Sequence, residues 1–382
     1  MRRLKRLAGL GAATAAALAL TAAVAAADPG NGNGYGNWHR PGPVFVQTDS
    51  ISGNAIAVYD RSPQGALTPA GTYATGGLGG RLEGSVVDHL ASQGSLVLDR
   101  PDGLLLAVNA GSDTVSVFAV DGDHLSLRQT IGSGGTFPVS IAVHDGVVYV
   151  LNALSGGSLQ GFRVFGGRLW PIPGSSRALG LDPKAEPQFV QTPGQVAFTP
   201  DGSKLLVTTK KNGEDLDVFA ADHFGRLSAA PVVNPLPGTV PFAIEFDRFG
   251  RLVLAEAGTN ALADFYVRWD GHIVPVSSAG TSQAATCWVV GADGRFYASN
   301  AGSASLSIFA ESFGGGLSLA GQQATDAGTV DAAATPDGRF LYVQAGALGV
   351  VDGYAIAPDG SLTPVGSVTV PDAVGGEGIV AP

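Results

Sequence analysis

The sequence has a single cysteine, Cys287, and lacks the short patterns of several catalytic and metal-binding sites. One thiol cannot form an internal disulfide, so the 382 residues must be stabilised by burial of apolar side chains. No HExxH or HxxxH pair is present, so nothing supports a zinc site. A GxSxG nucleophile elbow and a phosphate-binding GK[ST] loop are absent as well. We therefore expect no metal and no cofactor.

Cys287 lies in the apolar stretch 286–290, where a buried and inert thiol is the expected state. The alternative is a nucleophilic cysteine, which requires a neighbouring base. No histidine lies near it in the sequence to serve as that base.

Charge is scarce and mainly negative, with 14% charged residues and a formal net charge of −10. Residues 1–27 combine a basic start, an uncharged Ala/Leu stretch and small residues up to Ala27, which is typical of an export signal cleaved near that position. Removal of its four basic residues would leave a net charge of −14. Such a surface repels phosphate backbones and anionic headgroups, so nucleic acid is not an expected partner.

No other apolar run approaches the ~20 residues needed to cross a bilayer. We therefore expect a secreted or extracytoplasmic monomer without a membrane span. Residues 28–43 are rich in Gly and Asn, which predicts a flexible leader before a folded domain at 44–382.

Glycine accounts for 56 of the residues and marks a repeat. A Gly-containing turn followed by Leu or Ile and a new strand recurs seven times, at intervals of 58, 44, 58, 46, 44 and 45 residues; the positions are Leu67, Leu125, Leu169, Leu227, Ile273, Leu317 and Leu362. A period of about 45 residues is typical of four-stranded propeller blades. The sequence therefore predicts an all-β, seven-bladed propeller with four antiparallel strands in each blade.

The first blade lacks its innermost strand, because residues 44–48 already match the second strand of the other blades. The apolar segment 377–382 can supply that strand and remove two exposed sheet edges. We expect the C-terminal strand to close the ring beside 44–48. Two insertions, 76–94 and 175–195, interrupt the period where a fourth strand leads to the next first strand. They are either parts of a site or simply longer connections.

One polar position recurs at the end of the second strand of each blade; it is occupied by Gln47, Asn109, Asn152, Thr209, Glu256, Asn300 and Gln344. Six of the seven have a side-chain carbonyl or carboxylate, and these could form a ring of oxygen acceptors around the channel mouth that suits a hard cation such as Ca²⁺. Alternatively, each could form hydrogen bonds with neighbouring loop backbone. Because the pattern follows the repeat through every blade, the second interpretation is favoured.

Departures from the repeat give the candidate catalytic residues. Glu256 is the acidic member of the ring, and Lys210, Lys211 and Glu214 lie in the corresponding loop of the fourth blade. A Lys and a Glu at a channel mouth could orient a carbonyl and activate water, although a solvated ion pair is the alternative.

Two further residues, Glu245 and His89, are candidates for the site. Glu245 in an inner strand points either into the channel or to solvent. His89, in the first insertion, is the histidine best placed to reach the mouth.

The Pro-Asp-Gly hairpins and the segments 108–118 and 360–366 resemble those of the lactonase family of seven-bladed propellers, which includes 6-phosphogluconolactonase and carboxymuconate-lactonizing enzyme. The resemblance extends over the chain from Val44 onward and implies lactone chemistry at the channel mouth.

Family members that open lactones place a His after Pro at the start of an inner strand, together with Arg and Glu from neighbouring blades. The corresponding positions here are Val139, Gly194 and Phe242, so the Pro-His pair is absent. Glu245 and Glu256 are the alternatives for the family carboxylate.

Two functions follow as hypotheses. One is hydrolysis of a lactone or cyclic ester by Glu256, Lys210 and His89. The other is non-catalytic binding of a small molecule, a cell-envelope polysaccharide or a protein, with Asn109, Asn152, Lys211, Glu214, Glu245 and Asn300 as candidate binding residues. The fold supports both.

Overall fold

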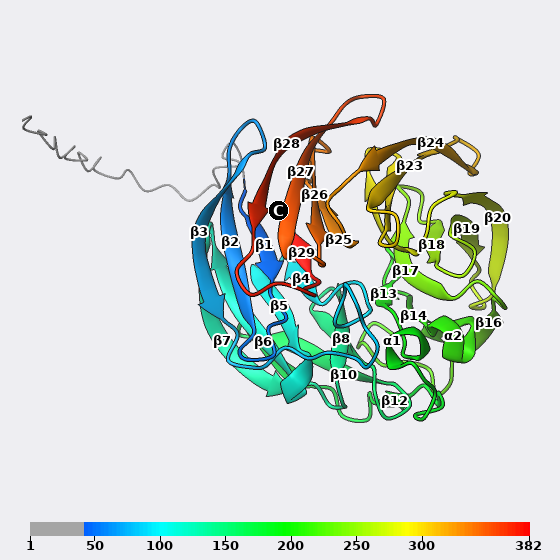
Figure 1. Ribbon diagram of the computed structural model, residues 1–382. Coiled ribbons are helices and arrows are strands. Elements are labelled where there is room, and N and C mark those ends of the chain that lie inside the picture. Colours follow the sequence, from blue (N-terminus) through cyan, green and yellow to red (C-terminus); the bar gives the residue numbers. More distant parts are fainter. Residues whose placement is uncertain (1–41) are drawn as a thin grey trace, which may run out of the picture. The chain divides into compact units, whose positions relative to one another are not determined.

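A computed structural model describes residues 42–382, which form seven antiparallel sheets arranged in a ring (Figure 1). The prediction of a seven-bladed propeller is confirmed. The predicted signal segment and nearly all of the predicted leader lie outside the described residues. Among the described residues, no helix is long and apolar enough to cross a membrane.

Each blade consists of four strands that follow one another from the channel outwards. The innermost strands are β29 (Ile379–Val380), β4 (Leu96–Asp99), β8 (Pro138–His144), β13 (Val196–Phe198), β17 (Pro241–Phe246), β21 (Thr286–Ala292) and β25 (Thr329–Ala334). The second strands are β1 (Val44–Gln47), β5 (Leu104–Asn109), β9 (Val147–Asn152), β14 (Lys204–Thr208), β18 (Leu252–Glu256), β22 (Arg295–Asn300) and β26 (Phe340–Ala345).

The outer half of each blade is formed by the third and fourth strands. The third strands are β2 (Ala55–Arg61), β6 (Thr114–Asp121), β10 (Ser158–Phe165), β15 (Asp215–Ala220), β19 (Ala261–Val267), β23 (Ser305–Glu311) and β27 (Val350–Ile356). The fourth strands are β3 (Leu67–Ala74), β7 (His124–Gly132), β11 (Arg168–Pro171), β16 (Val232–Pro235), β20 (Ile273–Gly280), β24 (Leu317–Ala324) and β28 (Leu362–Thr369).

The connections contain four short elements. They are the 3-10 turn η1 (Ala110–Ser112), the strand β12 (Arg177–Ala178), which pairs with β10, and the one-turn helices α1 (Gln188–Gln191) and α2 (Lys210–Gly213).

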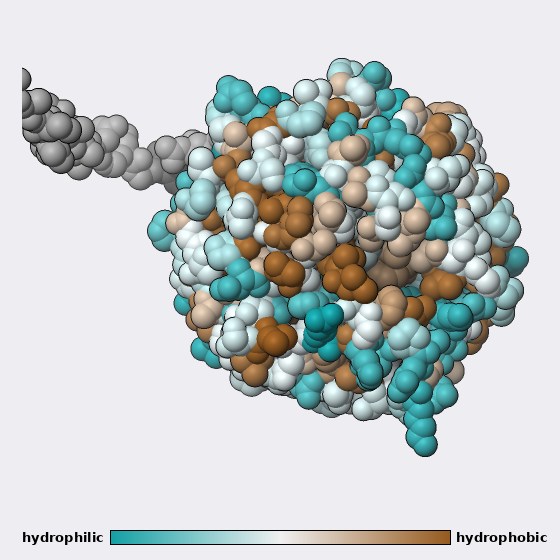
Figure 2. Space-filling model, viewed as in Figure 1, coloured by the Kyte–Doolittle hydropathy of each residue, from teal (hydrophilic) through white to brown (hydrophobic). Residues whose placement is uncertain are grey.

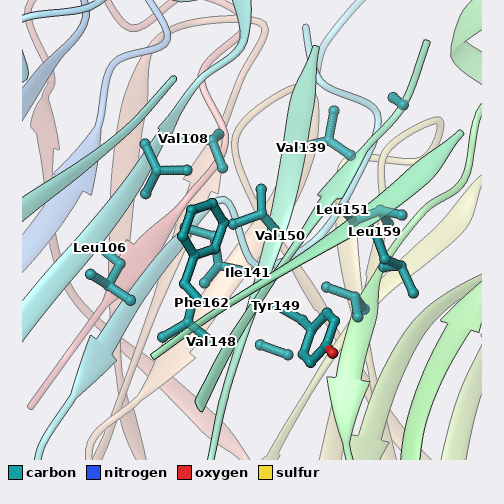
Figure 3. Close-up of a cluster of buried hydrophobic side chains, with 14 of the residues drawn as sticks. Leu106, Val108, Val139, Ile141, Val148, Tyr149, Val150, Leu151, Leu159 and Phe162 are labelled. Atoms are coloured by element: carbon teal, nitrogen blue, oxygen red, sulfur yellow. The ribbon is translucent and has the colours of Figure 1, made fainter. Parts of the chain in front are cut away.

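Within a blade, burial is greatest in the second strand and falls towards the fourth. All six residues of β5 and of β9 are buried, because neighbouring sheets cover both of their faces. The fourth strand β3, in contrast, is mostly exposed or half-buried. Figure 3 shows the core between two blades, where Leu106 and Val108 of β5 lie near side chains of β8, β9 and β10. This stacking of sheets explains the continuous apolar runs of the second strands.

The Pro-Asp-Gly turns are shaped by side-chain hydrogen bonds. In the turn before β26, the Asp337 carboxylate accepts hydrogen bonds from the Thr335 hydroxyl at 2.6 Å and from the Arg339 backbone N–H at 3.1 Å. Gly338 follows with a φ of +66°, a conformation that glycine adopts at little cost.

The ring closes as the sequence predicts. In β29, Val380 pairs with Phe45 of β1 and Ile379 pairs with Val46, and the backbone N–H of Gln47 donates to the oxygen of Gly378 at 2.8 Å. The last strand therefore completes the first blade, and the sheet edges on both sides of the closure are paired.

The first insertion crosses one end of the channel. Its residue Gln93 accepts a hydrogen bond on its backbone oxygen from the Ser140 hydroxyl of blade 3 at 2.7 Å. The Gln93 side-chain amide pairs with the backbone of Val289 in blade 6, with both distances 3.0 Å. One residue thus bridges two blades on either side of the channel, so this insertion is more than a longer connection.

Candidate functional site

A cavity of about 600 Å³ lies on the face that carries both insertions. The first insertion contributes Val86, Val87, Asp88 and Ala91, and the second contributes Phe189 and Val190. The remaining walls come from loops and strand starts of blades 4, 5 and 6, with mostly apolar side chains; they include Lys210, Lys211, Val240, Phe242, Ala257, Cys287, Trp288 and Ala301. Figure 2 shows apolar residues gathered near the middle of the face in view.

Phe242 and Trp288 form an aromatic wall of the cavity. Their ring centroids are 5.0 Å apart with an interplanar angle of 62°, an edge-to-face arrangement. The indole N–H of Trp288 donates to the backbone oxygen of Ser92 at 2.6 Å, which fixes the ring against the first insertion. Phe242 occupies one of the positions after Pro where the sequence resemblance implied a catalytic His. This position therefore carries an apolar ring and no acid/base group.

Lys210 is almost completely buried and joins the two insertions to blade 4. Its Nζ donates to the backbone oxygens of Ala91 and Phe189, both at 2.7 Å, and to the Thr192 hydroxyl at 3.2 Å. These acceptors match the three N–H bonds of an ammonium group. Burial nevertheless lowers the pKa of Lys210 to about 7, an effect that the nearby Asp88 carboxylate opposes.

Asp88 is the acidic residue in the cavity wall. Its carboxylate accepts the backbone N–H groups of Leu90 at 2.7 Å and Ser92 at 2.9 Å. Burial raises its pKa to about 6, while these hydrogen bonds and Lys210 limit the rise. Burial also raises the pKa of the Cys287 thiol to about 12. Cys287 is half-buried and lines the cavity, so it is less buried than the sequence predicts, while its raised pKa keeps the thiol protonated.

The recurring polar ring has a local role in the blades where its contacts are clearest. Asn300 is fully buried, accepts a hydrogen bond from the Thr286 hydroxyl at 2.6 Å and donates to the Ser307 hydroxyl at 3.0 Å. Asn109 is equally buried and donates to the Ser116 hydroxyl at 2.8 Å. Asn152, which is also fully buried, donates to the backbone oxygen of Ser133 at 3.5 Å. None of the seven ring positions contributes to the wall of the cavity.

Neither Glu256 nor Glu245 belongs to the wall of the cavity. Glu256 accepts a hydrogen bond from the Thr259 hydroxyl at 3.0 Å and faces a separate groove of about 660 Å³ beside Asn234. Glu245 lies toward the other end of β17, where it accepts the backbone N–H of Phe246 at 2.9 Å. Burial raises the pKa of both carboxyls.

The remaining candidates are also dispersed. His89 donates its backbone N–H to the oxygen of Gly375 at 2.8 Å, and burial together with the positive charge of Arg81 lowers the pKa of its ring. Glu214 accepts the backbone N–H of Gly238 at 2.9 Å. Of the residues proposed from the sequence, the cavity wall includes Lys210 and Lys211 but neither Glu256 nor His89.

Sequence reasoning missed the aromatic wall because it did not recognise β-bulges in the inner strands. Ladder irregularities follow Pro138, Pro241, Thr286 and Thr329, so Val139, Phe242, Cys287 and Val330 are equivalent positions. The equivalent residue is Val in two of these blades and Phe in blade 5. The change from Val to Phe242 in blade 5 was the sequence feature that could have indicated the aromatic wall.

A group of buried carboxyls at the ring closure was also missed. The Glu377 carboxylate accepts the backbone N–H of Gly94 at 3.0 Å, Asp49 accepts that of Glu377 at 2.8 Å, and Asp331 accepts that of Ile379 at 3.3 Å. Burial raises the pKa of Asp49 to about 8 and of Asp331 to about 7, and it raises that of Glu377 strongly. Within residues 42–382, no group of three or more such side chains is arranged to hold a metal ion.

Comparison with solved structures identifies the class of fold. A periplasmic gluconolactonase from Pseudomonas aeruginosa shares 18% identity over 88% of this chain and 98% of its own, with a TM-score of 0.72. A candidate 6-phosphogluconolactonase from Bacteroides fragilis shares 19% identity over 91% of this chain and 99% of its own, with a TM-score of 0.70. Virginiamycin B lyase from Staphylococcus aureus is more distant, at 10% identity over 77% and 89% of the two chains, with a TM-score of 0.53.

The chain is a seven-bladed β-propeller, the fold that it shares with these solved proteins. The fold that the sequence resemblance implied is therefore confirmed. No protein-family model and no curated protein sequence matches the chain. At these identities the structural similarity establishes the fold, and the activities of the solved proteins remain statements about those proteins.

Proposed function

We propose that this protein is an exported propeller that binds a small, largely apolar molecule in the cavity between its two insertions. The observation that carries the proposal is an apolar cavity whose one buried cation, Lys210, already has three hydrogen-bond acceptors. A volume of about 600 Å³ lies within the range of roughly 300 to 1,000 Å³ typical of small-molecule sites.

The construction of the cavity supports a binding role. Both insertions that interrupt the repeat contribute to its wall, and Lys210 and Trp288 fasten them to blades 4 and 6. A site held by such contacts is preorganised, so little ordering cost remains when a ligand enters.

A neutral apolar dye tests the proposal. N-phenyl-1-naphthylamine should bind wild type with enhanced fluorescence, and Ala257→Trp, which fills the cavity from its wall, should reduce binding at least tenfold. Phe313→Ala is the matched control, because this exposed side chain lies in the turn between β23 and β24, outside the cavity. Equal binding by wild type and Ala257→Trp would place the dye elsewhere and refute the cavity as the site.

Opening of a lactone is the second candidate function. Two observations favour it: the periplasmic gluconolactonase among the structural neighbours, and the Asp88 carboxyl in the cavity, whose pKa of about 6 suits a general base near neutral pH. Proton release with a panel of lactones should then be faster with wild type than with Asp88→Asn. Rates equal to buffer for wild type remove this candidate, whereas equal rates for both proteins remove Asp88 as the base.

Export is the cellular part of the proposal. It is supported by the basic and then apolar start of the sequence. Fractionation of cells that express the full chain, with N-terminal sequencing, should find a mature protein outside the cytoplasm that begins at or near Asp28. An uncleaved cytoplasmic protein would contradict it.

A further inference from the structure

We infer that the ligand of this cavity carries an anionic group, and that Lys211 at the cavity wall binds it. The ligand class is a hydrophobic carboxylate, with an apolar body in the cavity and one carboxylate at its edge. This inference rests on the proposed function, since it specifies the ligand of the same cavity.

Among the ionisable side chains of the cavity wall, Lys211 is the exposed cation. The wall contains Asp88, Lys210 and Lys211 together with the neutral Cys287 thiol. Asp88 and Lys210 are both buried, and hydrogen bonds to the insertions already occupy their polar groups. Lys211 adds a further positive charge at the edge of a mostly apolar cavity, in a protein whose formal net charge is −10.

Lys211 is free to bind a ligand, whereas Lys210 is not. The ammonium of Lys210 has three acceptors from the two insertions, so all its N–H bonds are used. Lys211 is exposed, and its ammonium makes no hydrogen bond or ion pair with any residue from 42 to 382. A ligand carboxylate beside it would gain an ion pair without displacing an existing partner.

The rest of the wall argues against other ligand classes. Sugars and other highly hydroxylated molecules need many hydrogen-bond partners, but Phe189, Phe242 and Trp288 present apolar faces, and the indole N–H of Trp288 is already bonded to Ser92. A cationic amphiphile would be repelled by Lys211. A ligand with an apolar body and a carboxylate matches both the aromatic side chains of the wall and the ammonium of Lys211.

Displacement of N-phenyl-1-naphthylamine by dodecanoate and by dodecanol tests the inference, because the two competitors share one chain and differ in charge. Both are used at pH 7.5, below the concentration at which dodecanoate forms micelles. Wild type should prefer dodecanoate by about fivefold, the upper range for a partly exposed ion pair. Lys211→Met should abolish this preference, and Lys211→Arg should retain it.

Lys184→Met is the matched control, since it removes the same charge from the second insertion outside the cavity wall and should keep the preference. Equal binding of acid and alcohol by wild type, or an unchanged preference in Lys211→Met, would overturn the inference while leaving the cavity as an apolar site. If wild type binds neither the dye nor either competitor, the inference and the proposed function fail together.

Discussion

Lys210 donates a hydrogen bond from Nζ to the backbone oxygen of Ala91 at 2.7 Å, between residues 119 positions apart in the sequence. The same ammonium reaches Phe189 and Thr192 in the second insertion. One buried cation therefore holds together the two segments that depart from the blade repeat. The cavity between them depends on this contact.

Replacement of Lys210 should destabilise the protein. Lys210→Met leaves two buried backbone oxygens and a hydroxyl without their hydrogen-bond donor. The free-energy cost of these unsatisfied acceptors exceeds the desolvation cost that is saved when the buried ammonium is removed. We expect the free energy of unfolding in urea to fall by about 2 kcal/mol, with weaker dye binding. Lys211→Met, one residue further on and exposed, should unfold like wild type. Equal midpoints for Lys210→Met and wild type would show that the two insertions are held by other contacts.

Removal of residues 378–382 should open the ring. The deletion eliminates the pairing of β29 with β1 and the burial of Ile379 and Ala381, which are 5% and 3% exposed. The expected loss is about 4 kcal/mol or more, seen as a fall of many degrees in the melting temperature. Val374→Ala, at a 59% exposed position just before the closing segment, serves as the control. A deletion variant that melts with the control would exclude closure by this strand.

The buried carboxyls at the closure predict loss of stability as pH rises. Asp49 has an ordinary pKa of 3.8 that burial raises to about 8, and Asp331 has one raised to about 7. A raised carboxyl pKa means that the folded state holds the proton more tightly than the unfolded state does. Its stabilising contribution is therefore complete below pH 3.8 and is lost as pH rises to about 8.

The melting temperature should accordingly fall between pH 5 and pH 8, and the fall should be smaller in Asp49→Asn, which keeps an oxygen to accept the backbone N–H of Glu377. Asp145→Asn, at an exposed turn, is the control and should retain the wild-type slope. Parallel pH profiles for wild type and Asp49→Asn would mean that Asp49 does not hold a proton in this range.

The polar ring should matter for folding and not for ligand binding. Asn300→Ala leaves the Thr286, Ser305 and Ser307 hydroxyls without the buried amide that they contact, at a cost of about 2 to 3 kcal/mol. Its affinity for N-phenyl-1-naphthylamine should stay within twofold of wild type. Loss of dye binding with unchanged stability would instead support the ring of ligand-binding acceptors.

Much of the fold could be predicted from the sequence, because each propeller blade is formed by residues close together in the chain and the blades repeat. Alternating apolar residues, Asp-Gly turns and the recurring Leu specify each hairpin locally, and neighbouring blades bury one another's faces. The missing first strand and the apolar segment 377–382 even indicated which two parts of the chain would meet. The sequence also showed that both insertions leave the same face, because each follows a fourth strand.

The candidate site could not be predicted in this way, because the sequence repeat does not indicate which side chains of different blades come into contact. Lys210 was noticed for its charge, yet its partners Ala91 and Phe189 come from separate insertions whose paths depend on packing. Glu256 belongs to the repeat and was expected at the mouth, but its strand end directs it to another groove.

Phe242 and Trp288 reach the cavity because inner-strand bulges shift the register of alternation by one residue. The sequence by itself thus determined the ring of blades, because the apolar pattern that each blade buries is local and repeats along the chain. The cavity arose from long-range contacts between the segments that break that periodicity.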